Sequence, residues 1–317
     1  MGLMGNKGPW FGLVGGPTEV GNVGCGAAEG PKVLRAAGLE TRLRAQGVAV
    51  RDMGDVTGPS YDGSVDSDAC RSLEATAAWC AEVRDACAHV LAEGGVPVML
   101  GGDHSLGLGS VAAAGVHARA RGVPLYVLWF DAHPDFNTPE TSPSGNTHGL
   151  PAAAACGLGS PDLTGICGPV AALDPTRLFQ FGIRSVDPGE RDNLLRHGVT
   201  FHDMDDLRRE GLVALVGRVL DRARAEDAHV HVSFDMDGLD PIHAPGVGTP
   251  VADGMDLDEV LAAMDLLGRS GLVGSFDLVE FAPCRDQGGA TLASALRLLE
   301  RFAVAAAGVE AVPAQVA

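Results

Sequence analysis

The chain has 317 residues, 46% hydrophobic and 20% charged, so it can form a sizeable core and lacks the composition of a disordered protein. Its formal net charge of -18 argues against binding to nucleic acid or to an anionic membrane surface. There is no linker-like stretch, no signal-peptide pattern and no apolar run near the roughly 18 residues of a membrane-spanning helix. We therefore expect one cytoplasmic domain over residues 1–317, with seven scattered, reduced cysteines.

Short apolar runs alternate along the chain with longer stretches of helical period. The runs predict eight strands, at Trp10–Val14, Val48–Asp52, Val96–Leu100, Leu125–Phe130, Leu178–Gly182, Val199–Phe201, Val230–Phe234 and Val273–Val279. The other stretches predict helices at Pro31–Ala37, Asp68–Glu93, Gly107–Arg121, Gly189–His197, Leu212–Arg224, Leu257–Ser270 and Thr291–Ala307. The alternation is typical of a parallel sheet covered by helices on both faces. We therefore expect an α/β fold, a three-layer α/β/α sandwich with an eight-stranded parallel sheet.

Three predicted strands lead directly into segments rich in acidic residues and histidine. These segments are Gly101–Ser105, Asp131–Asp135 and Asp235–Pro241, and a long loop over Thr138–Pro151 follows the second of them. Ligands of open parallel sheets bind beyond the carboxyl ends of the strands, so these segments are candidates for a functional site. One such segment alone is more often a turn or a helix cap, but three at the same edge are hard to obtain by accident.

The spacing within these segments predicts a metal site. Side chains two residues apart on an extended backbone point to the same side, which brings the acidic and imidazole groups of each segment together. Four carboxylates in one crevice repel one another unless cations neutralise them, and two divalent ions supply the required charge. The predicted ligands are His104, Asp131, His133, Asp135, Asp235 and Asp237.

Six ligands give each of two ions four contacts only when two carboxylates bridge, and we assign this role to Asp131 and Asp235. Oxygen-rich ligation with two imidazoles and no thiolate favours Mn²⁺ over Zn²⁺, with Co²⁺ or Ni²⁺ as substitutes in vitro. Two such ions about 3.5 Å apart generate a hydroxide nucleophile at neutral pH. The sequence therefore predicts a dinuclear hydrolase with two Mn²⁺ per chain.

The same three segments resemble, in order and separation, the signature segments of the arginase/agmatinase family, the ureohydrolases. The similarity extends to Glu29–Arg35 and Gly248–Pro250 and so covers nearly the whole chain. It implies a two-manganese centre with the six ligands above, a small guanidino substrate and a homo-oligomer, either a trimer or a hexamer.

The long loop also resembles that of true arginases, in which the matching Asn and Ser bind the α-carboxylate of L-arginine. This similarity places Asn137, Ser144 and Asn146 in the substrate site. Asp187 and Glu190 resemble the two acids that recognise the α-amino group. Acids suit an ammonium group and neutral donors suit a carboxylate, so the polarity agrees with an amino-acid head group.

The resemblance also implies a mechanism. Glu280 matches the glutamate that pairs with the substrate guanidinium, and Thr249 is expected to support it. His148 matches the imidazole that carries protons to or from the departing amine, and Asp135 is a candidate for the first proton transfer. A metal-bridging hydroxide would then add to the guanidinium carbon and release L-ornithine and urea.

Two segments depart from the family pattern. Phe281-Ala282-Pro283 lacks the Asn that commonly precedes the proline, and Pro17–Ala28 differs from the usual basic or Gly-rich entrance loop. The alternative substrates are agmatine or another guanidino compound. Outside enzymes, the alternative is an inactive metal-binding protein that senses arginine or serves as an assembly subunit. A deacetylase-like member of the wider fold is disfavoured, because it would need neither His104 nor Glu280.

Overall fold

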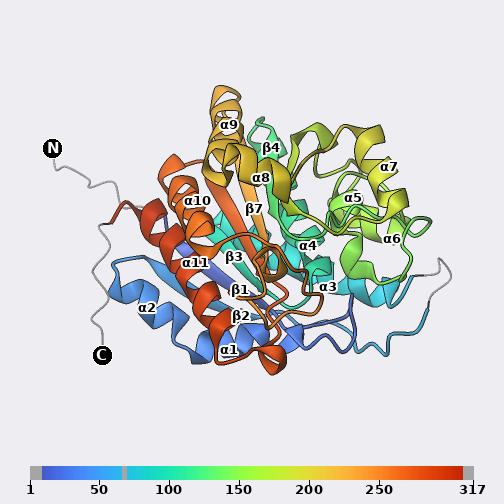
Figure 1. The fold of residues 1–317 in the computed structure, drawn as a ribbon, viewed down its shortest axis with the longest axis horizontal. Helices are drawn as coiled ribbons and strands as arrows, with labels where there is room; N and C mark the ends of the chain where they lie inside the picture. Colours follow the sequence, from blue (N-terminus) through green and yellow to red (C-terminus); the bar gives the residue numbers. More distant parts are fainter. Residues whose placement is uncertain (1–8, 66–69, 310–317) are drawn as a thin grey trace.

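The computed structural model describes residues 9–65 and 70–309 of the chain. Its strands form one parallel sheet in the order β2-β1-β3-β8-β7-β4-β5-β6 (Figure 1). The strands are β1 (Phe11–Gly16), β2 (Val50–Asp55), β3 (Val96–Gly101), β4 (Leu125–Phe130), β5 (Leu178–Ile183), β6 (Thr200–Asp203), β7 (His229–Asp235) and β8 (Val273–Val279). The predicted three-layer sandwich with eight parallel strands is confirmed.

Helices cover both faces of the sheet (Figure 1). One face carries α1 (Gly30–Ala36), α2 (Leu39–Ala45), α8 (Met204–Glu210), α9 (Leu212–Ala225), α10 (Leu257–Ser270) and α11 (Ala290–Ala307). The other face carries α3 (Leu73–Ala92), α4 (Gly107–Ala120), α5 (Pro151–Ala155), α6 (Pro161–Thr164) and α7 (Pro188–His197). Among the described residues, no helix combines the length and apolar character needed to cross a bilayer.

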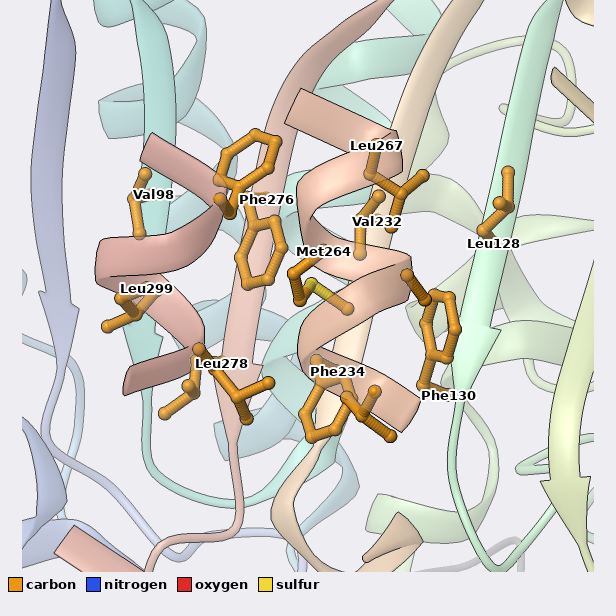
Figure 2. Packing of buried hydrophobic residues seen from close by; sticks show 14 of the residues in the cluster. Val98, Leu128, Phe130, Val232, Phe234, Met264, Leu267, Phe276, Leu278 and Leu299 are labelled. Atoms are coloured by element: carbon orange, nitrogen blue, oxygen red, sulfur yellow. The ribbon is translucent and has the colours of Figure 1, made fainter. Parts of the chain in front are cut away.

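The largest part of the core lies between the sheet and the layer of α10 and α11. Figure 2 shows Val232 and Phe234 of β7 pointing to the same side as Phe276 of β8, against Met264 and Leu267 of α10. Side chains on a strand alternate between the two faces, so the residues of β7 between these apolar ones point toward α4 on the other face. That second face is also buried, as expected for a parallel sheet covered on both sides.

Several predicted boundaries were wrong. Strand β2 begins two residues later and ends three residues later than predicted, because its polar residues Asp52 and Asp55 pair with Arg35 at an exposed edge. Helix α3 begins only at Leu73, since Ser72 before it has a left-handed φ of 53°. The first two residues of the helix predicted over Asp68–Glu93 lie outside the described residues. The short helices α2, α5, α6 and α8 were missed.

The strand order explains how distant segments come together. Five strands adjacent in the sheet, β3, β8, β7, β4 and β5, lead into the segments that contain the predicted site residues. All strands are parallel, so their carboxyl ends open at one edge of the sheet. The candidate site is therefore built by loops at the centre of that edge.

Candidate active site

The predicted metal ligands meet at this edge. His104 begins η2 (His104–Leu106) directly after β3, Asp131 follows β4, and Asp235 ends β7. The Nδ1 atom of His104 lies 3.0 Å from Oδ2 of Asp131. The same nitrogen lies 3.1 Å from Oδ2 of Asp135 and 3.1 Å from Oδ2 of Asp235. Three buried carboxylates thus surround one imidazole nitrogen.

A second group lies beside the first. The Nδ1 atom of His133 is 3.1 Å from Oδ2 of Asp237 and 3.5 Å from Oδ1 of Asp131. Asp131 therefore faces His104 with one carboxylate oxygen and His133 with the other, the position predicted for a bridging ligand. Two sets of side chains are close enough to hold a metal ion, and Asp131 belongs to both: His104, Asp131 and Asp135; and Asp131, His133 and Asp237.

Asp235 was predicted as the second bridge. Its Oδ2 faces His104, whereas its Oδ1 accepts a hydrogen bond of 2.7 Å from the backbone N–H of Asp237. Asp235 belongs to neither of the two sets that can hold an ion. The structure therefore places it beside His104, without a described contact to His133.

The chemistry of these groups fits divalent cations. An imidazole nitrogen carries at most one hydrogen, which cannot serve three carboxylates, and Oδ2 of Asp135 is buried without a hydrogen bond. Burial raises the pKa of Asp135 to about 6 and that of Asp235 well above its ordinary value. The separations of 3.0–3.1 Å match the roughly 3.0 Å between neighbouring ligand atoms around an ion with bonds of about 2.1 Å. Carboxylate-rich ligation with two imidazoles suits such an ion.

Local backbone geometry holds the carboxylates in place. Oδ1 of Asp131 accepts a hydrogen bond of 2.7 Å from the N–H of His133, and the indole N–H of Trp129 donates to Oδ2 at 3.0 Å. Asp135 has a φ of 51°, and Glu280 in the same site has a φ of 63°. Non-glycine residues seldom adopt this left-handed conformation, which costs free energy and is concentrated at functional sites.

Glu280 follows β8 and reaches into the same region. Its Oε1 accepts a hydrogen bond of 2.9 Å from the backbone N–H of His104 and lies 3.3 Å from Nδ1 of His148. Its Oε2 is fully buried and has no hydrogen-bond partner in the structure. Although burial opposes protonation of His148, the contact with Glu280 raises the pKa of His148 to about 9. The imidazole of His148 and the unpaired carboxylate oxygen of Glu280 therefore lie in the same site.

The predicted head-group residues of the long segment after Asp135 are hydrogen-bonded within the structure. Asn137 is buried, and its amide N–H donates to Oδ2 of Asp187 at 3.0 Å. Ser144 is exposed, and its hydroxyl oxygen accepts a hydrogen bond of 3.2 Å from the backbone N–H of Asn146. The amide of Asn146 donates to Oδ1 of Asn22 at 3.3 Å. Asn137 thus contacts Asp187, and Asn146 contacts the entrance loop.

The two predicted acids differ in accessibility. Glu190 is buried, and its carboxylate accepts the backbone N–H groups of Phe136 at 2.8 Å and of Asp187 at 3.2 Å. Asp187 is only partly buried. Of the two, Asp187 offers the more accessible carboxylate, and Glu190 ties the start of α7 to the long loop.

Thr249 has a different partner from the one we expected. Its hydroxyl group donates to Oδ2 of Asp237 at 2.9 Å. The expected support for Glu280 comes instead from the backbone, since the N–H of Glu280 donates to the carbonyl of Gly102 at 2.8 Å. Thr249 thus acts on a predicted metal ligand.

The divergent entrance loop Pro17–Ala28 is hydrogen-bonded to the turn after β3, which leads to the predicted ligand His104. The backbone N–H of Gly21 donates to Oδ2 of Asp103 at 2.8 Å, and its carbonyl accepts the N–H of His148 at 3.2 Å. A Cβ atom at Gly102 would lie 1.6 Å from the carbonyl oxygen of Thr18. Only glycine permits this close approach, so Gly102 and Asp103 position the loop over His148.

A buried polar cluster that was not predicted lies behind the candidate metal ligands. Strand β7 has His229, His231, Ser233 and Asp235 at alternate positions, and all four are buried on the face covered by α4. Asp277 on β8 is paired with Ser233 in the sheet register. The signal in the sequence was a period-two polar pattern inside an apolar run, which a search for polar groups beyond strand ends passes over.

The model of the arginase family matches residues 10–305. The chain belongs to the arginase family. It is 39% identical to the arginase of Brucella melitensis over 290 residues, which is 90% of this chain and 94% of that protein. As an arginase-family protein, it carries a buried His/Asp site and hydrolyses C–N bonds.

Solved structures agree in fold. The native arginase of Bacillus caldovelox matches with a TM-score of 0.86 at 34% identity, covering 93% of this chain and 98% of that one. The proclavaminate amidino hydrolase of Streptomyces clavuligerus matches with a TM-score of 0.67 at 26% identity, covering 95% and 92%. The structural similarity therefore extends to a protein named for another substrate.

Proposed function

We propose that this protein hydrolyses L-arginine to L-ornithine and urea at a site that holds two Mn²⁺ ions. The observation that carries the proposal is the buried, unpaired Oε2 of Glu280 beside the two groups of metal ligands. An unpaired buried carboxylate oxygen is costly, and a planar guanidinium group offers parallel N–H donors to such an acceptor. Arginases with 34–39% identity over about nine tenths of the chain support this substrate.

The six predicted ligands would hold the ions, with His104 and His133 on opposite sides of Asp131. When bound, two divalent ions supply a water of lowered pKa as the nucleophile. We propose Mn²⁺ because four carboxylates and two imidazoles form a hard, oxygen-rich site. Asp135, whose Oδ2 has no hydrogen bond, is the candidate to receive the first proton.

The remaining steps fall to Glu280 and His148. Glu280 pairs with the guanidinium group and orients its carbon, which then gains the oxygen of water. The bond from this carbon to the ε-nitrogen of arginine breaks, urea forms, and that nitrogen becomes the δ-amino group of ornithine. His148 shares the carboxylate of Glu280 and gives its proton to the departing nitrogen, so that ornithine leaves as a neutral or protonated amine.

The head group of the substrate is assigned to the mouth of the site. We propose that Asn137, Ser144 and Asn146 act on the α-carboxylate and that Asp187 acts on the α-amino group, with Glu190 holding Asp187 in place. Neutral donors and an accessible acid match the two charges of an amino acid. A cytoplasmic homo-oligomer is also part of this proposal, on family resemblance.

The second candidate is hydrolysis of another guanidino compound, such as agmatine. This alternative is supported by the structural similarity to proclavaminate amidino hydrolase and by the divergent Pro17–Ala28 loop. The test is urea release from L-arginine, agmatine and guanidino acids by the Mn²⁺-loaded protein. We expect the highest kcat/KM with L-arginine. A higher value with a substrate lacking the α-amino acid group would replace arginine by that substrate.

A further inference from the structure

The buried carboxylate of Asp277 lies behind the metal site. Its Oδ2 accepts hydrogen bonds from the hydroxyl of Ser110 on α4, from the hydroxyl of Ser233 at 3.3 Å and from Nε2 of His231 at 3.0 Å. Its Oδ1 is buried and has no hydrogen-bond partner. In the described part of the chain, no lysine or arginine forms an ion pair with it. Burying a carboxylate that has no lysine or arginine beside it costs free energy unless another group compensates its charge.

Ser233 links this carboxylate to His104. The hydroxyl oxygen of Ser233 is 2.9 Å from Nε2 of His104, whose Nδ1 faces the carboxylates of the metal site. With Nδ1 turned to a cation, the hydrogen of the imidazole is on Nε2 and is donated to Ser233. Ser233 in turn donates its own hydrogen to Asp277. The hydrogen bonds therefore run in one direction, from His104 through Ser233 to the carboxylate of Asp277.

A second chain of donors ends on the same carboxylate. Ser275 lies 2.8 Å from Nδ1 of His231 and 3.2 Å from Nε2 of His229. Hydrogen bonds running from His229 through Ser275 and His231 to Asp277 satisfy all these groups as neutral side chains. Asp277 is thus the last acceptor of both chains of donors, and a cation held by His104 would act on it through Ser233.

The two imidazoles of the candidate metal site, His104 and His133, differ in their hydrogen-bond partners. The ring of His104 is fully buried, stacks on Trp129 with centroids 4.1 Å apart and reaches Asp277 through Ser233. The side chain of His133 is 27% exposed, and the described residues give its Nε2 no comparable acceptor. A carboxylate that accepts, directly or through a relay, from a ligand imidazole fixes its tautomer and strengthens the metal bond.

We propose that Asp277 is a positioning residue that strengthens, through Ser233, the binding of the cation held on the His104 side of the site. This inference rests on the two-ion site of the proposed function. It assigns Asp277 no contact with substrate. Its effect is confined to one of the two ions, because Asp277 has no described path to His133.

The test is calorimetric titration of the metal-free full-length chain with Mn²⁺. Asp277→Asn keeps the shape and removes the charge, whereas Ser233→Ala keeps the charge and removes the link. We expect each substitution to lower the affinity for one of the two Mn²⁺ ions about 10- to 100-fold and to leave the affinity for the other unchanged. Ser275→Ala is the matched control, because Ser275 is equally buried and precedes Asp277 by two residues on β8 but does not connect it to His104.

A double variant separates positioning from general damage to the fold. In the background of His104→Asn, Asp277→Asn should cause no further loss of Mn²⁺ affinity, whereas in the background of His133→Asn its full effect should persist. Should Asp277→Asn fail to fold, Ser233→Ala decides the question with the same titration. Two ions bound with wild-type affinity by Ser233→Ala and Asp277→Asn would overturn the inference, as would equal weakening by Ser275→Ala. A wild-type chain that binds two ions and releases no urea would overturn the proposed function alone.

Discussion

At the scale of single residues, Glu280 combines the features expected of a substrate-binding group. Its Oε1 accepts a hydrogen bond from the backbone N–H of His104 and contacts Nδ1 of His148, whereas its Oε2 is buried and has no hydrogen-bond partner. Its left-handed φ of 63° is held by the bond from its N–H to Gly102. Strain maintained by surrounding contacts is typical of groups that must be placed accurately.

The roles of Glu280 and Ser144 can be separated by kinetics. Glu280→Gln keeps the shape of the side chain and removes the charge that pairs with the guanidinium, so kcat should fall by at least about 100-fold. Ser144→Ala should raise KM for L-arginine, since a lost hydrogen bond to a charged group costs about 1.5–3 kcal/mol. Steady-state urea release measures both. Agmatine, which lacks the carboxylate, is the control substrate, and an equal rise of its KM in Ser144→Ala would contradict the assignment.

His148 gives a prediction about pH. Its pKa is raised to about 9 in the folded chain by Glu280, whereas the unfolded value is near 6.5. The stabilisation is therefore fully present below pH 6.5 and is lost as the pH rises through 9. In metal-free protein, denaturant titrations should show a loss of about 2 kcal/mol between pH 7 and 9.5 from this group. His148→Asn should lack this component, and an identical pH dependence in the two proteins would refute the pairing.

The candidate ligands were predicted on the rule that alternate residues of an extended segment share a side. That rule grouped Asp131, His133 and Asp135 before any family resemblance was considered, but the segment is not extended: Asp135 has a φ of 51° and faces His104, whereas His133 faces Asp237. It did not predict that Oδ1 of Asp235 is occupied by the backbone of Asp237, because such turns depend on local dihedral angles. Glu280 came only from the resemblance, since one acidic residue after a strand has no distinguishing pattern.

At the scale of elements, strands were predicted better than short helices. A buried parallel strand such as β4 is a continuous apolar run that ends at a polar residue, Asp131, which is a strong local signal. Helices of four to seven residues, such as α2 and α6, are too short to show a helical period and depend on packing. The strand order was not predicted, because crossover connections do not reveal in the sequence which strands become neighbours.

The contact between the entrance loop and the turn after β3 is a testable element of the site. Gly102→Ala would place a Cβ atom 1.6 Å from the carbonyl oxygen of Thr18, so either the entrance loop or the turn after β3 must move. We expect a loss of about 1–3 kcal/mol in the free energy of unfolding and a raised KM for L-arginine. Denaturant unfolding and urea release measure the two effects. Gly165→Ala is the control, because a Cβ there meets nothing within 4 Å; equal stability and kinetics in both variants would contradict the account of the loop.

At the scale of the whole molecule, metal binding and folding are coupled. Buried carboxylates gathered at one edge of the sheet repel one another, and cations bound only by the folded chain remove that repulsion. Two ions, each at 100 times its dissociation constant, stabilise the fold by about 5 kcal/mol in total. Mn²⁺ should therefore raise the melting temperature by several degrees over chelator-treated protein. Equal melting temperatures by calorimetry would mean that the ligands do not form a site together.

The most direct measurement follows urea release from L-arginine as Mn²⁺ is added to the metal-free protein, with bound metal determined on the same samples. We predict negligible release without metal, and full activity when two ions are bound per chain, with one ornithine formed for each urea. Full activity with one ion or none, or no urea from L-arginine at two ions per chain, would contradict the proposal of a dinuclear arginine hydrolase.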